Sequence, residues 1–237
     1  MTPEQRTGQP VGSAGEPSAS EIEDREADLK AALDDLAAVV ADAATLEQLL
    51  KQVAASAVHA IPHADGVGIC LLRLDQPDRR VQALATSHPF VERVDAIQYE
   101  MVDEGPCITA AADRTAVRTG DISVDPRWPR FGPWVGRFGV HSVLSLPMLM
   151  PDGRVVGAIN AYSHSRDRFD DHAVTVGLLF AAPAGVAVHN AQVLAQAQTR
   201  AAQLQAALGS RAIIDQAIGI IRSRAGVSAE EAFARLR

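Results

Sequence analysis

The sequence predicts an α+β fold, in which two β-hairpins are enclosed by helical segments and followed by a long C-terminal helix. Apolar runs of strand length occur in two pairs, and a turn-forming stretch separates the members of each pair. Apolar residues at helical spacing dominate both ends of the chain. A glycine stop and a capping box near the C-terminus mark the end of one helix and the start of another.

Length and composition limit the possible classes of protein. The chain has 237 residues, 47% of them hydrophobic, and a formal net charge of -7. That is enough for one medium domain with helical appendages. We expect no membrane span, because no run approaches the necessary apolar length, and the N-terminus lacks the order of a secretory signal. The two cysteines form neither a disulfide framework nor a zinc-ligand spacing, so we expect reduced thiols in a cytoplasmic protein.

The N-terminal region divides into three predicted segments. Residues 1–20 are rich in Pro, Gly, Ser and Thr, and we expect them to be disordered. Residues 21–43 are predicted to be helical, with a short apolar seam of the kind that more often packs within a chain than forms a dimer. Thr45 and Gln48 mark the start of another helix, which runs toward Pro62. The seam consists of Leu29, Leu33, Leu36 and Val40.

Four strands are predicted in the middle of the chain. Val67–Leu74 and Val81–Thr86 form one pair across a turn that contains Pro77 and Asp78. Val143–Met150 and Val155–Tyr162 form the other pair across a Pro-Asp-Gly loop, whose composition suits a hairpin.

Helical spacing returns after the second hairpin. Asp170 or Asp171 is expected to cap a helix, and a long helical run is predicted from about 184 to 225. Gly209 and Ser210 are expected to loosen or bend that run. Together with the N-terminal seam, the run predicts a parallel homodimer with coiled helices.

The last segment, 211–237, has an apolar helical face and a local positive charge. Gly226 ends its first helix, and Ser228 with Glu231 opens a second. Two helices this short cannot bury that face alone. Five arginines against three acidic residues give the segment a charge of +2 and leave -9 for the rest. A basic end can contact phosphates, although a solvated helix face is the alternative. The arginines are Arg211, Arg222, Arg224, Arg235 and Arg237.

This pattern resembles the opening of an ANTAR domain, the RNA-binding antiterminator module of bacterial regulators. The resemblance implies a three-helix bundle, and we expect the sequence to be truncated inside or just after the second helix. It also implies dimerisation-dependent binding of RNA stem-loops, with phosphate contacts from the five arginines. Ala217, Gly219, Ala232 and Phe233 are expected to pack rather than to bind. The matching residues are Arg211, Ile214, Ala217, Gly219, Ile220, Arg224, Ser228, Glu231, Ala232, Phe233, Leu236 and Arg237.

Residues 44–195 resemble a GAF domain, a sensor module found in front of ANTAR modules. The resemblance implies an antiparallel sheet with helices packed on its faces and a pocket covered by irregular segments. We expect a helical linker at 196–210 between this sensor and 211–237. Gly105-Pro106 and the Pro-rich run 126–133 are predicted to be shaped loops. The motifs are Glu104-Gly105-Pro106-Cys107, Asp125-x-Arg127-Trp128-Pro129 and Gly157-Ala158-x-Asn160-x-Tyr162.

An apolar cavity around an unidentified small ligand is one hypothesis for the middle region. The alternative is that its aromatic residues only fasten the loops to the sheet. Cys107 has two interpretations, a redox or chromophore-bearing thiol and an inert buried residue. The signature of cyclic-nucleotide-binding GAF domains is not evident. The candidate pocket residues are Tyr99, Gly105, Pro106, Cys107, Trp128, Phe131 and Trp134.

No catalytic constellation is evident, and we do not expect an enzyme. His59 and His63 have metal-ligand spacing, but Pro62 interrupts the helix that would align them. The favoured hypothesis is a cytoplasmic signal-responsive regulator in which a GAF-like sensor controls an RNA-binding module acting in transcription antitermination. The alternative is a small-molecule-binding or dimerisation protein whose C-terminal helices mediate protein contacts. A third hypothesis is a redox enzyme that uses Cys107.

Overall fold

The computed structural model describes residues 45–72 and 81–236, together with 27, 30, 31, 33, 34, 36 and 37. For 83 and 207–212 it describes the backbone only. The predicted disordered segment 1–20, most of the predicted helix 21–43, the turn between the first two strands and Arg237 lie outside the described residues.

Five antiparallel strands form one sheet in the order β2-β1-β5-β4-β3. Both predicted hairpins are confirmed, since β1 pairs with β2 and β4 pairs with β5. The strands are β1 Gly66–Leu72, β2 Val81–Thr86, β3 Val117–Thr119, β4 Ser142–Leu149 and β5 Val155–Ser163.

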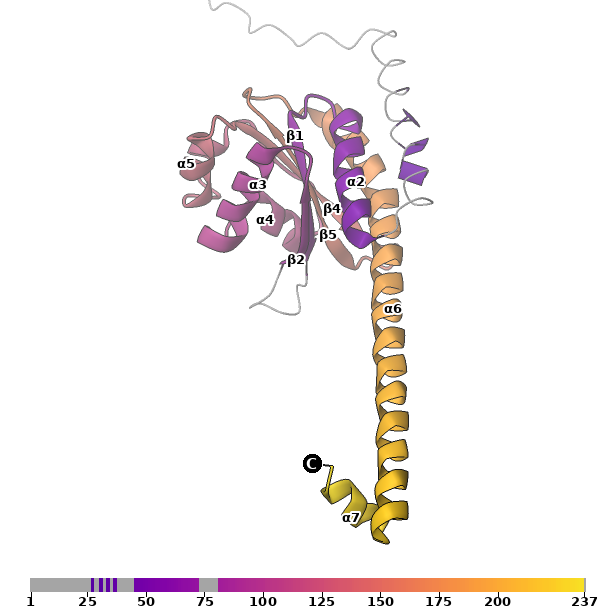
Figure 1. Ribbon diagram of the computed structural model, residues 1–237. Helices are drawn as coiled ribbons and strands as arrows, with labels where there is room; N and C mark the ends of the chain where they lie inside the picture. The colour runs from indigo at the N-terminus through magenta and orange to yellow at the C-terminus, as the bar shows by residue number, and fades with distance from the viewer. Residues whose placement is uncertain are drawn as a thin grey trace, which may run out of the picture.

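Helices cover both faces of this sheet (Figure 1). On one face lie α2, Leu46–Ala60, and the first part of α6, Asp171–Ala225. The α+β prediction, an antiparallel sheet flanked by helices, is therefore confirmed. The other face carries α3 Pro89–Ala96, the π-helix η2 Ile97–Val102, α4 Pro106–Asp113, the 3₁₀ turn η3 Ile122–Val124 and α5 Phe131–Gly136.

The helix α6 is 55 residues long and extends well beyond the sheet, where the short α7, Ala229–Ala234, folds back against it (Figure 1). The helix expected to begin at Asp170 or Asp171 and the long run predicted from about 184 are one continuous helix, which accommodates Pro183 on its exposed side. Gly209 and Ser210, which were expected to loosen or bend the helix, lie within its continuous helical backbone.

The predicted helix ends are confirmed by their hydrogen bonds. The Thr45 hydroxyl accepts from the backbone N–H of Gln48 at 3.2 Å. The Asp170 carboxylate accepts from the N–H of Ala173 at 2.8 Å. Gly226 has a φ of 65° at the end of α6, and a reciprocal capping box opens α7. These signals succeed because each cap depends only on residues within one helical turn.

The prediction that the Pro-containing segments form loops is wrong at two positions. Pro106 is the first residue of α4, and Pro133 lies in the first turn of α5. The first turn of a helix has no intrahelical partner for its N–H groups, so a proline there costs no hydrogen bond.

The two faces of the sheet differ in chemistry, because successive side chains of a strand point to opposite sides. The face toward α2 and α6 is apolar, and Leu36 from the N-terminal region is buried in the same core. The opposite face presents buried polar and small residues. The apolar face contains Val67, Ile69, Leu71, Leu144, Leu146, Met148, Ile159 and Ala161.

The first 36 residues of α6, Asp171–Ala206, have the length and composition of a possible membrane span. The expectation that no segment is apolar enough over the length of a membrane span is therefore wrong, because this part of α6 meets both criteria. Half of the most apolar window is buried against the rest of the protein, as expected for the core helix of a folded domain. No membrane function follows from its composition.

Candidate functional site

Buried polar groups gather on the face of the sheet that is turned toward α3 and α4. Tyr99 is half-buried, and the other seven members are almost completely inaccessible to solvent. Interiors rarely contain so many polar side chains in one place unless they serve a purpose beyond packing. We call this group the polar cluster, and it consists of Cys70, Asp95, Gln98, Tyr99, Cys107, Ser145, Asn160 and Tyr162.

Strand register explains how the sheet side of the polar cluster is built. Asn160 of β5 lies opposite Gly68 of β1 and Ser145 of β4, so the three positions form one row across the sheet. Gly68 leaves room for the carboxyl group from α3, because a Cβ there would lie 2.7 Å from Asp95 Oδ2. The row is therefore a polar strip of the sheet against which α3 packs.

The helical side of the polar cluster comes from α3 and η2. Val91 and Val94 pack against the sheet, and Asp95 and Gln98 follow on the same side of the helix. Val94, Asp95 and Gln98 follow Val91 by three, four and seven residues, and this spacing places all four side chains on one face of the helix. A carboxyl group and an amide thus occupy positions where an amphipathic helix normally carries apolar residues.

Hydrogen bonds satisfy only part of the polar cluster. Tyr162 donates its hydroxyl hydrogen to Asp95 Oδ1 at 3.0 Å, and Asn160 Nδ2 donates to the Tyr99 hydroxyl at 3.4 Å. The backbone N–H of Cys107 donates to Gln98 Oε1 at 3.4 Å. A buried polar atom without a partner costs about 1–3 kcal/mol. Four atoms lack a protein partner, namely Asp95 Oδ2, Gln98 Nε2, Ser145 Oγ and Asn160 Oδ1.

Burial also shifts the protonation of the polar cluster. Removal from water raises the pKa of Asp95 from 3.8 to about 7, despite the opposing hydrogen bond from Tyr162. Burial likewise raises the pKa of the Cys70 thiol and of the Tyr99 and Tyr162 hydroxyls well above their ordinary values. Asp95 is therefore the member of this group that changes charge near neutral pH.

A turn at 103–105, here called the 103–105 turn, covers the Gln98 side of the polar cluster. Glu104 fixes this turn to the start of α5, because its Oε1 accepts from the N–H groups of Arg130 and Phe131 at 2.8 and 3.0 Å. Gly105 lies directly over Gln98, and a Cβ at that position would be 2.1 Å from Gln98 Oε1. These contacts give the Glu-Gly-Pro-Cys motif a physical role as a cover.

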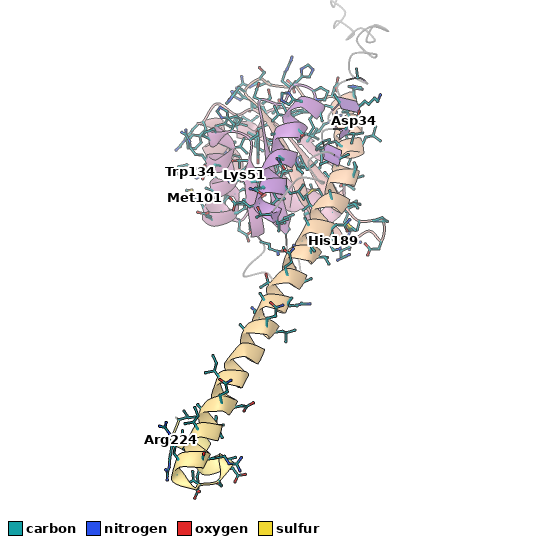
Figure 2. All side chains as sticks on the ribbon, turned by 45° about the vertical axis from the view of Figure 1, so that its right-hand side comes forward. Asp34, Lys51, Met101, Trp134, His189 and Arg224 are labelled. Atoms are coloured by element: carbon teal, nitrogen blue, oxygen red, sulfur yellow. The ribbon has the colours of Figure 1, made fainter. Side chains whose placement is uncertain are left out.

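The candidate pocket residues lie in three different places. Tyr99 and Cys107 belong to the polar cluster, and Gly105 and Pro106 lie at its cover. Trp128 and Phe131 are buried in an adjoining apolar cluster. Trp134 is 43% exposed on the outer side of α5, on the flank where Met101 also lies (Figure 2).

Six residues of the polar cluster were not predicted as site residues from the sequence, namely Cys70, Asp95, Gln98, Ser145, Asn160 and Tyr162. Asp95 of α3 and Gln98 of η2 were detectable as a carboxyl and an amide on an apolar helical face. Asn160 was detectable as a polar residue inside the otherwise apolar β5 run. Ser145 depends on knowing which face of β4 meets α4, and that information is tertiary.

The C-terminal end of the chain presents exposed arginines. Arg222, Arg224 and Arg235 are exposed and form no ion pair within the part of the chain that the structure describes. Figure 2 shows Arg224 at the end of α6 that is remote from the sheet. The side chain of Arg211 and the whole of Arg237 are not among the described parts.

An apolar groove lies beside these arginines, between α6 and α7. Its volume is about 340 Å³, and Ile213, Ile214, Ala217, Phe233 and Leu236 line it. Ile213 is 68% exposed and Phe233 is 46% exposed, whereas Ala232 is buried. The expectation that the two helices cannot bury this face alone agrees with these values.

Among the described residues, no group of three or more His, Cys, Asp or Glu side chains is placed to hold a metal ion. His59 and His63 are separated by the end of α2 at Ala60. Both thiols, Cys70 and Cys107, are unoxidised and completely buried.

Comparison with protein families identifies two regions of the chain. A GAF domain model matches residues 43–189, and an ANTAR domain model matches residues 202–237. The chain therefore belongs to the GAF domain family, with an ANTAR domain at its C-terminal end. No curated protein matches it by sequence. A GAF sensor followed by an ANTAR domain fits a signal-responsive regulator.

Solved structures support the fold assignment. A GAF domain of a phosphoenolpyruvate-protein phosphotransferase from Coxiella burnetii is similar with a TM-score of 0.57 and 18% identity, covering 72% of this chain and 98% of that one. The corresponding Acinetobacter domain has a TM-score of 0.51 and 16% identity, covering 70% and 98%. The free methionine-R-sulfoxide reductase of Neisseria meningitidis has a TM-score of 0.53 and 18% identity, covering 78% and 98%. At these identities the likeness extends to the fold alone.

Proposed function

We propose that this protein is a cytoplasmic regulator in which the GAF domain senses a small molecule and controls RNA binding by the ANTAR domain in transcription antitermination. The proposed division is a sensor at 44–195, a helical linker at 196–210 and an RNA-binding segment at 211–237. In this proposal the protein is not an enzyme, because a sensor domain needs only to bind its ligand.

The observation that carries this proposal is the continuity of α6. Its first turns pack on β4 and α2 inside the GAF domain, and its last turns bear Arg222 and Arg224. A single helix rises about 1.5 Å per residue, so 55 residues extend over roughly 80 Å. A displacement of the packed end is therefore carried as a rigid-body movement to the exposed end.

The chemistry of the exposed end suits an RNA partner. Arg222, Arg224 and Arg235 are exposed guanidinium groups that pair with no acidic side chain among the described residues. Phosphates are the matching partners, and shape recognition of a stem-loop requires a surface of this kind rather than a base-reading pocket. Arg211 and Arg237 are proposed to extend the same surface.

The test is binding to a tandem stem-loop RNA across a salt series, with a scrambled hairpin as control. Arg222→Ala and Arg224→Ala should each weaken binding and reduce the salt slope by about 0.7 to 0.9 per lost phosphate contact. Arg114→Ala is the matched control, because Arg114 is an exposed arginine at the end of α4 in the GAF domain. Equal binding of both RNAs, or equal effects of all three variants, would remove the RNA-binding proposal and favour a protein-contact role for the C-terminal helices.

A parallel homodimer is part of the proposal. Beyond the sheet, α6 carries exposed Leu204, Ile213 and Ile220, and an isolated helix gains most of its stability from packing. A groove of about 380 Å³ between α2 and α6, lined in part by Leu46 and Leu194, continues this apolar surface onto the GAF domain. Light scattering should report a dimer at micromolar concentration. A monomer at that concentration would contradict it.

A further inference from the structure

We propose that the polar cluster binds a compact organic cation, an ammonium or amidinium group, which pairs with the Asp95 carboxylate. The inference rests on the proposed sensing function of the GAF domain and specifies the chemical class of its ligand.

The four unpaired atoms define what a ligand must offer. Asp95 Oδ2 and Asn160 Oδ1 accept hydrogen bonds, Gln98 Nε2 donates them, and the Ser145 hydroxyl does either. All four side chains are at most 1% exposed, so bulk solvent does not satisfy these atoms. Their hydrogen-bonding capacity matches a ligand with at least two N–H donors and one acceptor, and the proposed cationic group supplies the donors.

The charge of the site selects a cation over a neutral donor. Asp95 has a hydrogen bond from Tyr162, but it forms no ion pair with any cationic side chain in the described part of the chain. The other titratable groups near it are Tyr162 on β5, Tyr99 on η2, Cys70 on β1 and Cys107 on α4. None of these groups is a cation, so above about pH 7 the carboxylate has no counter-charge among the described residues, and a bound cation would supply it.

The site is closed over by the 103–105 turn, and the ligand enters when this turn moves. Asp103 has a φ of 47°, and η2 is a π-helix, an arrangement often found at functional sites. The turn is fastened mainly through Glu104, whose carboxylate accepts three hydrogen bonds from Arg130 and Phe131. Breaking these surface bonds exposes Gln98 without unfolding the sheet.

The experiment measures binding of guanidinium and methylammonium chlorides to the full chain by calorimetry and by the shift in melting temperature. Sodium chloride at equal ionic strength controls for salt, and acetamide is a neutral probe of similar size. We expect at least one organic cation to bind saturably. Acetamide should bind with an affinity at least about tenfold lower than that of the cation. The affinity of the cation should fall as pH is lowered through about 7, because protonated Asp95 has no charge to offer.

The key variant is Asp95→Asn, which keeps the size and the hydrogen bond from Tyr162 but removes the charge. It should lose the preference for cations, whereas Asp113→Asn at the exposed end of α4 should keep it. If Asp95→Asn does not fold, the comparison of cation with acetamide on the unmodified chain still decides.

Absence of saturable cation binding, equal binding of acetamide, or unchanged cation preference in Asp95→Asn would each overturn the inference. Stem-loop RNA binding is measured separately on the same preparation. Lost cation binding with intact RNA binding overturns only the ligand class, and cation binding with no RNA binding overturns only the proposed regulator.

Discussion

Replacing the buried carboxyl group, Asp95→Asn, should change how the free energy of unfolding depends on pH. In the unfolded chain this carboxyl group has an ordinary pKa near 3.8, and in the folded protein burial raises its pKa to about 7. Between these two values the folded state retains a proton that the unfolded state has released. Stability must therefore fall as pH rises through this window, by about 4 kcal/mol in total.

The variant has no proton to retain, so it should not show this loss. Its amide leaves buried N–H donors in place of the carboxyl oxygen, at a pH-independent cost of about 1–3 kcal/mol. We therefore expect Asp95→Asn to be less stable than the unmodified protein near pH 4. It should be more stable by about 2 kcal/mol near pH 8, with the curves crossing between.

Urea unfolding at a series of pH values, followed by the fluorescence of Trp128 and Trp134, measures this difference. Asp113→Asn, at the exposed end of α4, is the control and should keep the pH dependence of the unmodified protein. Parallel stability curves for Asp95→Asn and the unmodified protein would refute the reasoning, because they would mean that Asp95 ionises equally easily in both states.

Two further substitutions test the architecture around the site. Gly157→Ala should lower the free energy of unfolding by about 3 kcal/mol or more, because its Cβ would lie 2.0 Å from the Cys70 carbonyl oxygen in the adjacent strand. Thermal unfolding measures this loss. The control is Gly153→Ala, which should cost less, because a Cβ there has open space although φ is 79°. Glu104→Gln should cost about 1–2 kcal/mol by weakening the hydrogen bonds to Arg130 and Phe131. Hydrogen exchange should become faster at 103–107, and unchanged exchange there would show that Glu104 does not fasten the turn.

The sequence predicted best those features that depend on neighbours in the chain. The hairpin between β4 and β5 follows from a Pro-Asp-Gly loop between two apolar runs, and the ends of α6 follow from Asp170 and Gly226. The helix capped at Asp170 and the long run from about 184 were predicted as separate segments, and the structure joins them into one helix across Pro183. A proline on the exposed side of a well-packed helix costs one hydrogen bond, and the packing of Phe180 and Ala184 on the sheet outweighs it.

The candidate site was only partly predictable, because it depends on strand register. Tyr99 and Cys107 were selected from their position near a recognisable motif. Asn160 was part of another motif, but its proximity to Asp95 follows only from the pairing of β5 with β1 at Gly68. Local patterns show that a strand exists, but they do not show which residues of another segment face it.

The alternation of β5 provides a physical connection between the polar cluster and the long helix. Asn160 points toward α3 and α4, while the adjacent Ile159 and Ala161 point into the core shared with α2 and α6. We expect a ligand that pairs with Asn160 to shift β5, whose other side packs in the same core as Phe180 and Ala184 of α6. Close-packed interiors transmit such displacements because they contain little free volume. Truncating Ile159 to Val should therefore weaken the effect of a bound cation on RNA affinity while leaving cation binding itself unchanged.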